Sequence, residues 1–282
     1  MAQYIIFHNF TPLQVAIVGG GFNGLVAAVA LRRSGHLVEI YQPESHVQVG
    51  ASVFCLTENT REWLCEWDVD LSDMKPIASM NLTMHESETG KKHEGDVSSV
   101  FHLRDMYTAL LKAALSGEGK GTPCKLFIDH ICDGVDAAAG SISFKNGATV
   151  SADLILGAEG IPAGLGIPSM NQSVQPWFKE KACILGDAAP PMTLQLQGTY
   201  QSIKNAAALG IIFSNKYNFT KNVKAGLELY QTVRRYELTT VTEYDLRTRI
   251  AQVAKFRSRN GVQLSLLSNR LGNDRILFGM II

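Results

Sequence analysis

The sequence predicts an α/β protein built on a Rossmann-like parallel sheet, and two observations predict it. First, an apolar run at residues 14–18 ends in a glycine-rich turn and is followed by a helix-like segment and a second strand-like segment at 37–41. Second, two later apolar runs, 154–157 and 182–185, also end beside glycines. Short continuous apolar runs of this kind are typical of strands buried on both faces of a parallel sheet.

The first strand, helix and strand together form a βαβ unit of about 30 residues. Small and apolar side chains in residues 24–33 predict the helix, and Gly35 is placed to end it in a left-handed conformation. Residues 36–42 form the second strand, so we expect a right-handed crossover between the two strands.

The segment after this unit predicts one helix and one hairpin. The helix is expected around residues 57–68, with Thr57 or Asn59 near its start because both residue types cap helices well. Residues 80–100 predict a β-hairpin with its turn at 88–92.

The second half of the chain continues the alternation of helices and strands. Asp105 is a possible N-cap for a helix starting near Met106, whose apolar stripe comprises Met106, Leu110, Ala113 and Ala114. The Lys-Asn-Gly-Ala step at 145–148 is a strong hairpin signal. Helices are expected over 199–215 and, with an amphipathic, arginine-rich pattern, over 225–267.

Composition narrows the class of protein. The 282 residues include 26 basic and 26 acidic side chains, and this balance argues against a nucleic-acid partner. No apolar run reaches the roughly 18 residues of a membrane span, and the first residues do not resemble a secretory signal. We therefore expect a cytoplasmic protein with reduced thiols and no metal site, since metal-like spacing is absent from the five cysteines, Cys55, Cys65, Cys124, Cys132 and Cys183.

The first candidate site is the glycine-rich turn, in which Gly19, Gly21 and Gly24 form G-x-G-x-x-G. The first glycine permits a tight turn, the second lets the backbone approach a pyrophosphate, and the third lets helix and strand pack closely. The motif alone is weak, but its position between a predicted strand and a predicted helix strengthens it. The sequence therefore predicts a dinucleotide site at the start of this helix.

Gln42 occupies a position where such a site usually has an acid. An acidic residue about 20 residues after the glycines normally holds the ribose hydroxyls. Here a neutral amide could do that work, Glu44 could reach back, or the site could have decayed.

Two further candidates lie later in the chain. Asp187 follows Gly186 at the end of a predicted strand and precedes two alanines, which suits close approach of a ligand hydroxyl; the alternative is a helix N-cap. Arg104 could contact a phosphate or hold a cofactor loop, and its alternative is a surface ion pair worth little stability. No catalytic residue is assigned.

Four ordered segments carry a resemblance to a known family: VAIVGGGFNGLVAAVALRRSGHLVEIY, FHLRDMYTALLKAA, ADLILGAEG, and ILGDAAPPM with QGTYQSIKNAAALG. They resemble the class A FAD-dependent flavoprotein monooxygenases, most closely the salicylate-hydroxylase-like members of fungal specialised metabolism. The resemblance implies a glutathione-reductase-type FAD-binding fold, with FAD as cofactor and NAD(P)H as transient reductant. It also implies that Arg104 supports the flavin and that Asp187 binds its ribityl chain.

The chain also departs from the family pattern. Glu159 replaces the aspartate of an Asp-Gly motif, Pro190 replaces a common histidine, and Lys204 with Asn205 replaces Glu-Asp. Most of the β-sheet domain that covers the substrate in the family is missing. The resemblance divides the chain into a first FAD-binding part at 1–75, a residual substrate-domain hairpin at 76–103, a second FAD-binding part at 104–215 and a C-terminal helical region at 216–282.

Three functional hypotheses follow. The first is an FAD-dependent monooxygenase or oxidoreductase acting on a small aromatic, polyketide or terpenoid-type metabolite, with a second copy or another subunit covering the open cleft. The second is an enzyme that has lost redox chemistry and catalyses a cofactor-free cyclisation or isomerisation in the same cleft. The third is an inactive remnant, or a sequence that lacks an exon.

Overall fold

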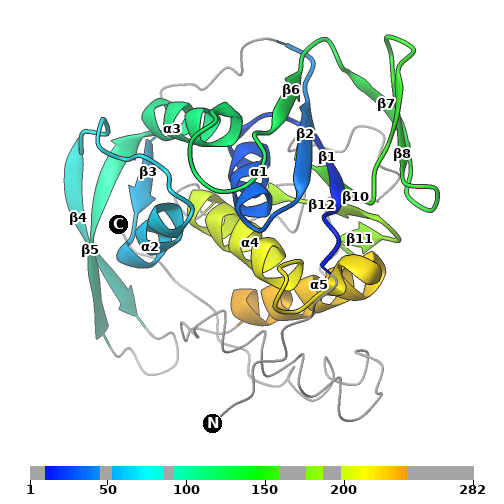
Figure 1. The fold of residues 1–282 in the computed structure, drawn as a ribbon. Coiled ribbons are helices and arrows are strands. Elements are labelled where there is room, and N and C mark those ends of the chain that lie inside the picture. The colour runs from blue at the N-terminus through cyan, green and yellow to red at the C-terminus, as the bar shows by residue number, and fades with distance from the viewer. Residues whose placement is uncertain (1–9, 45–52, 86–91, 159–175, 187–197, 240–282) are drawn as a thin grey trace.

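A six-stranded sheet forms the centre of the molecule in the computed structural model, which describes residues 10–44, 53–85, 92–158, 176–186 and 198–239 (Figure 1). Its strand order is β11-β12-β10-β1-β2-β6. All neighbours pair in parallel except β11 with β12, which confirms the predicted parallel sheet. The strands are β1 (Gln14–Val18), β2 (Leu37–Tyr41), β6 (Lys125–Phe127), β10 (Leu154–Gly157), β11 (Phe178–Lys179) and β12 (Ala182–Ile184).

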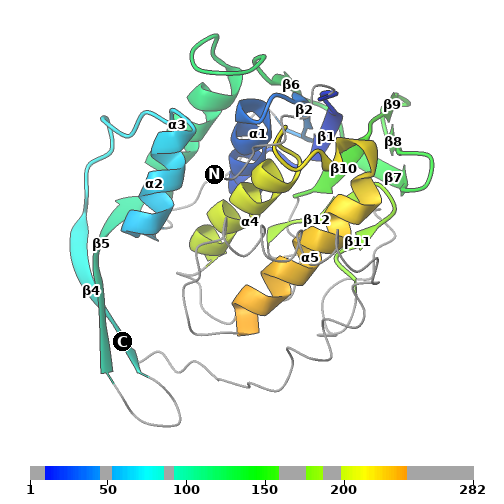
Figure 2. The same ribbon diagram turned by 60° about the horizontal axis from the view of Figure 1, so that its bottom comes forward.

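Helices cover one face of this sheet. The first helix, α1 (Phe22–Arg33), lies in the middle and contacts both α3 (Leu103–Leu115) and α4 (Gly198–Ile212). A short turn, η2 (Phe219–Lys221), leads to α5 (Val223–Thr239), which packs against α4 and β11 (Figures 1 and 2). The predicted helices at 24–33, 199–215 and the start of 225–267 are confirmed.

A three-stranded antiparallel sheet adjoins β2 and β6 and comprises β7 (Cys132–Asp136), β8 (Ser141–Phe144) and β9 (Thr149–Ser151). The ring of Tyr41 joins the two sheets, because its centroid lies 5.0 Å from that of Phe127 and 5.0 Å from that of Phe144. Burial raises the pKa of Tyr41, and the hydrogen bond that its hydroxyl donates to Glu39 adds to that shift. Gly147 has φ +86° in the predicted hairpin turn, where a left-handed residue is required.

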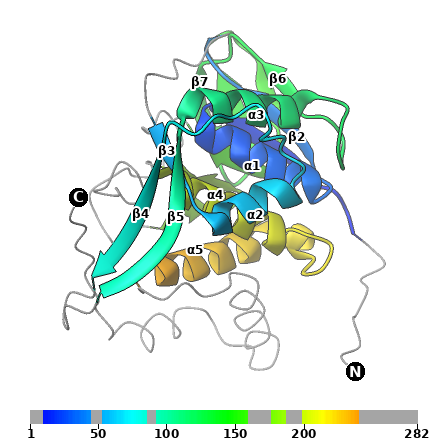
Figure 3. The same cartoon turned by 90° about the vertical axis from the view of Figure 1, so that its left-hand side faces the viewer.

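A third sheet, β3-β5-β4, lies to one side of the helices (Figure 3). The predicted hairpin is confirmed as β4 (Ala78–His85) and β5 (Lys92–His102), and β3 (Val53–Leu56) adds a third strand to it. The chain then enters α2 (Glu58–Glu66). Its N-cap is Thr57, which was one of the two residues predicted near its start.

The start of α3 differs from the prediction. The helix begins at Leu103 with His102 as its N-cap, so Asp105 lies in the first turn and does not cap it. A carboxylate in the first turn still interacts favourably with the positive end of the helix, which explains why the pattern resembled a cap. The predicted apolar stripe is confirmed, because Met106, Leu110, Ala113 and Ala114 are all buried.

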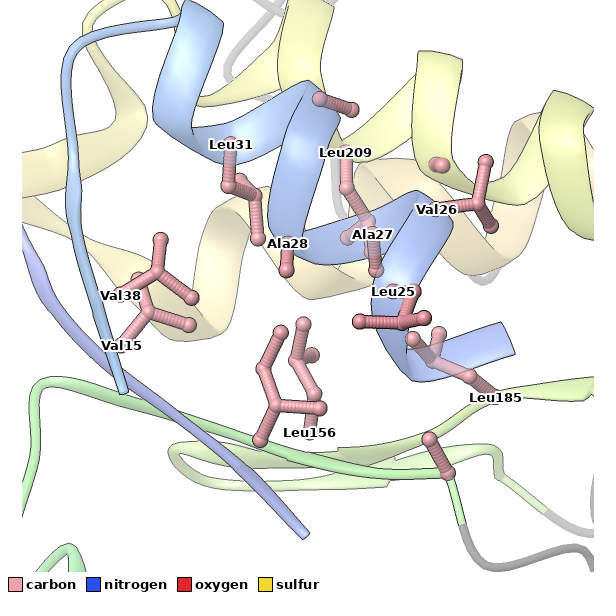
Figure 4. Packing of buried hydrophobic residues seen from close by; sticks show 14 of the residues in the cluster. Val15, Leu25, Val26, Ala27, Ala28, Leu31, Val38, Leu156, Leu185 and Leu209 are labelled. Atoms are coloured by element: carbon pink, nitrogen blue, oxygen red, sulfur yellow. The ribbon is translucent and has the colours of Figure 1, made fainter. Parts of the chain in front are cut away.

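The core is centred on α1, which is buried along its whole middle section from Gly24 to Arg32. The α1 side chains of Leu25, Ala28 and Leu31 point toward the sheet, where Leu156 lies (Figure 4). Leu209 of α4 packs against a different side of α1. A helix that is apolar all round must be enclosed by other elements. Its position explains the unusually small and apolar composition of this segment.

Two buried polar side chains fix the far end of α1. The guanidinium of Arg32 is fully buried and donates to the carbonyls of Ala113, Ala114, Glu118 and Gly121, so it closes the end of α3 and the loop after it. His36 accepts a hydrogen bond from the Leu13 N–H at Nδ1 (3.1 Å), and its Nε2 lies 3.1 Å from the Phe213 carbonyl. This geometry requires the neutral imidazole with its proton on Nε2.

Candidate functional site

Three candidate segments meet at one edge of the central sheet. The glycine turn follows β1, Gln42 follows β2, and Gly186 comes two residues after β12. Because these strands are parallel, their carboxyl ends lie at the same edge. Ligands of open α/β sheets bind outside this edge.

The outer glycines of the motif shape the turn itself. Gly19 has φ +109°, and its N–H donates a 2.8 Å hydrogen bond to the carbonyl of Tyr41, which ties the turn to β2. A Cβ added at Gly24 would overlap the carbonyl oxygen of Gly19. The first and third glycines are therefore required by backbone conformation and by close packing.

Gly21 differs because its surroundings are open. It is the N-cap of α1 with an extended backbone, and no heavy atom of the described chain comes within 4 Å of a Cβ added there. The N–H groups of the first helical turn have no acceptor within the helix. Open space beside these N–H groups is what an anionic ligand needs at a helix N-terminus.

Gln42 lies directly against this turn. It is 3% exposed, and its Nε2 donates a 2.6 Å hydrogen bond to the carbonyl of Glu44. Its Oε1 is buried and has no hydrogen-bond partner in the described part of the chain. A Cβ at Gly20 would overlap this oxygen, so the amide packs directly against the backbone of the glycine turn.

The geometry bears on two of the three interpretations of Gln42: that its amide holds the ribose, and that Glu44 does so instead. Glu44 contacts Gln42 through its backbone carbonyl, and the residue is exposed, so the described structure shows no contact between the Glu44 carboxylate and the Gln42 amide. Leaving a buried acceptor unpaired costs about 1–3 kcal/mol. A ligand hydroxyl that donates a hydrogen bond to Oε1 would remove this cost.

A polar contact connects the turn to the other end of the site. Gly186 has φ +70°, and a Cβ there would overlap the side-chain amide of Asn23 in the first turn of α1. Asn23 Oδ1 accepts a short hydrogen bond from the hydroxyl of Ser202 in α4. Three segments distant in sequence therefore meet at one side chain.

Among the remaining candidates that the structure describes, Arg104 shows no contact with these three segments. Arg104 is exposed in the first turn of α3 and, within the described residues, forms no ion pair; its carbonyl accepts a hydrogen bond from Thr108. Asp187, Glu159 and Pro190 lie outside the described residues. Asn205 accepts a 2.7 Å hydrogen bond from Arg234 in the buried contact between α4 and α5.

Three residues of this site were not predicted from the sequence: Gly20, Asn23 and Ser202. A third consecutive glycine is one signal that could have revealed Gly20. A polar side chain in an otherwise apolar buried segment is the corresponding signal for Asn23. Ser202 carries no local signal, because its role depends on a partner 179 positions away.

Comparisons with known proteins agree with this fold. Residues 17–66 match the family model described as an NAD(P)-binding Rossmann-like domain. The chain is 33% identical over 160 residues to hispidin-3-hydroxylase from Neonothopanus nambi, covering 53% of this chain and 38% of that protein. It is 28% identical over 162 residues to the FAD-dependent monooxygenase cfoG from Aspergillus candidus, covering 53% and 37%. The match thus spans less than two fifths of either curated relative.

A solved structure shares the architecture. CtdE in complex with FAD superposes with a TM-score of 0.65 at 13% identity, over 87% of this chain and 99% of that one. The fold is therefore the Rossmann-like FAD-binding type, as the sequence predicts. The resemblance to fungal FAD-dependent monooxygenases is likewise confirmed.

Proposed function

We propose that this chain binds FAD at the carboxyl edge of its central sheet and carries the cofactor-binding part of a monooxygenase that acts on a small organic metabolite. The observation that carries this proposal is that, among the described residues, the buried Oε1 of Gln42 has no hydrogen-bond partner and the space beside Gly21 is open. The Gln42 oxygen needs a hydrogen-bond donor such as a ribose hydroxyl, and the open space at Gly21 accommodates an anion. The name of one curated relative, the FAD-dependent monooxygenase cfoG, agrees with FAD chemistry.

Each residue of the site has a distinct part in this proposal. The N–H groups at the start of α1 bind the diphosphate, Gly21 leaves room for it, and Gln42 accepts from the ribose. Gly186 keeps the backbone close to the ligand, while Asp187 and Arg104 contact the ribityl chain and the flavin region as the family resemblance implies. When bound, FAD would supply the redox chemistry, with NAD(P)H as the reductant.

The domain division and the substrate side are part of the same proposal. Residues 1–75 and 104–215 hold the cofactor, the β4–β5 hairpin within 76–103 faces the substrate, and 216–282 form the C-terminal helical region. The β3-β5-β4 sheet is small for excluding water from a reaction site, so a second copy or another subunit would complete the cover. A small aromatic, polyketide or terpenoid-type metabolite is the substrate class proposed.

Location is proposed with the function. Within the described residues, no helix combines the length and apolar character that crossing a bilayer requires. The five cysteines form no disulfide: Cys55, Cys124, Cys132 and Cys183 are buried, and Cys65 is exposed. Free thiols fit a reducing compartment, so we place the protein in the cytoplasm.

The test is the visible absorption spectrum of the purified protein, followed by titration with FAD. We expect a bound-flavin spectrum that NADPH bleaches. Gly21→Val should raise the Kd for FAD at least tenfold, because its side chain fills the open space, and should lower the stability of the ligand-free protein by no more than about 1 kcal/mol, the usual cost of a poor N-cap residue. Gly117→Val is the matched control. A Cβ added at Gly117 also meets no other described atom within 4 Å, and this glycine lies in the loop after α3, away from the candidate site.

Two results would overturn the proposal. A folded, colourless protein that refuses FAD would exclude the cofactor and turn attention to cofactor-free cyclisation. A flavin that binds equally well to wild type and Gly21→Val would place the cofactor elsewhere.

A further inference from the structure

Helices α1 and α4 lie side by side and run in the same direction, with a side-chain hydrogen bond near each end. At the end near the glycine turn, Ser202 donates to Oδ1 of Asn23. At the other end, the Ser34 hydroxyl lies 2.9 Å from the Gly210 carbonyl of α4 and 2.9 Å from the Ala30 carbonyl of its own helix, and its one proton is shared between them. The two contacts are alike in chemistry, but only the first lies beside the candidate site.

The first contact orients the amide of Asn23. Because Oδ1 faces Ser202, the other corner of the amide, Nδ2, lies against Gly186 at the end of β12. Asn23 belongs to the first turn of α1, whose backbone N–H groups have no acceptor within the helix. An amide donor therefore stands beside backbone donors at the positive end of the helix.

A second observation indicates that this edge is built for a ligand. The Oε1 of Gln42, on a side chain that is 3% exposed, has no partner within the described residues and presses on Gly20 of the same turn. Donors gathered at one place and an unpaired acceptor nearby match a molecule that carries both phosphate oxygens and a sugar hydroxyl.

We propose that Asn23 donates a hydrogen bond from Nδ2 to the diphosphate of the bound dinucleotide, and that Ser202 is the positioning residue that holds its amide in this orientation. This inference rests on the proposed function. It makes α4 part of the diphosphate site, although α4 follows β1 by some 180 positions. The hydrogen bond to a charged oxygen is of the stronger kind.

Asn23→Asp separates this role from a structural one. Aspartate has nearly the same shape and can still accept from Ser202, and a carboxylate in the first turn favours the helix. The ligand-free protein should therefore keep its unfolding midpoint or gain slightly. Binding should weaken, because an anionic oxygen replaces the donor that faces the diphosphate.

The experiment measures the Kd of FAD by flavin fluorescence and the Kd of ADP by calorimetry, for wild type and three variants. We expect Asn23→Asp to weaken FAD and ADP by the same factor, at least tenfold, since both carry the diphosphate. Ser202→Ala should weaken both about tenfold. Ser34→Ala removes the matching hydrogen bond at the far end of the helix pair, and it should lower stability while leaving both Kd values unchanged.

The outcomes distinguish this inference from the proposed function. If wild type binds no FAD, the proposed function fails and this inference fails with it. If wild type binds FAD but Asn23→Asp binds FAD and ADP equally well, only the role of Asn23 is refuted. If Ser202→Ala and Ser34→Ala change Kd alike, Ser202 acts through general stability and its positioning role is wrong.

Discussion

His36 predicts a specific loss of stability in acid. The imidazole is fully buried, and this burial lowers its pKa from 6.5 to about 4, although the hydrogen bond to the Phe213 carbonyl opposes the shift. Protonation would also turn Nδ1 into a donor facing the Leu13 N–H, which already donates to it. The folded protein therefore favours the neutral ring, whereas the unfolded chain binds a proton near pH 6.5.

The direction and size of this change in unfolding free energy follow from proton linkage. Between about pH 6.5 and 4 the unfolded state binds more protons, so the stabilisation is complete above pH 6.5 and is lost as the pH falls toward 4. The difference between 6.5 and about 4, at about 1.4 kcal/mol per pH unit, corresponds to about 3 kcal/mol.

The assay is urea unfolding of the ligand-free protein across this pH range, for wild type and His36→Gln. Other groups also titrate in acid, so the informative quantity is the difference in unfolding free energy between the two proteins. Wild type should be the more stable near neutral pH, and the difference should shrink by about 3 kcal/mol toward pH 4. Parallel curves over the whole range would refute the assignment of a neutral, hydrogen-bonded His36.

Three other substitutions test the packing and the site. Gly24→Ala should lower the urea midpoint by the equivalent of about 3 kcal/mol, because its Cβ overlaps the Gly19 carbonyl; an unchanged midpoint would contradict this. Arg32→Met should cost about 4 kcal/mol in the same assay, since four carbonyls each lose a donor, and Arg33→Met should cost less, because two of its three hydrogen bonds to carbonyls are exposed. Gln42→Leu should raise the Kd for FAD about tenfold with a stability change under about 1 kcal/mol, and an unaltered Kd would remove Gln42 from the ribose site.

Local patterns were sufficient for most of the fold. Continuous apolar runs identified β1, β10 and β12, because a strand buried on both faces needs no polar residue, whereas β2, which contains Glu39, was identified by its place after the first helix. The start of α3 was wrong because Asp105 satisfies the helix dipole from inside the first turn, and a carboxylate in either place produces the same sequence pattern.

The site was predicted in its glycines and only partly in its side chains. Gly19 and Gly24 are dictated by backbone geometry, which a short motif records. The orientation of Gln42 depends on the carbonyl of Glu44 and on Gly20, and that of Asn23 depends on Ser202. Contacts between distant residues leave no periodic trace, so spacing alone could not reveal them.

The burial of α1 also constrains how the chain can be made. The helix leaves the ribosome early, yet the elements that enclose it, α3 and α4, end at Leu115 and Ile212. Until the latter has been synthesised, an almost entirely apolar helix has part of its surface uncovered, which is a state prone to aggregation. A fragment containing only the first βαβ unit should therefore need a chaperone to stay in solution, and the cofactor site is completed only once about three quarters of the chain has been made.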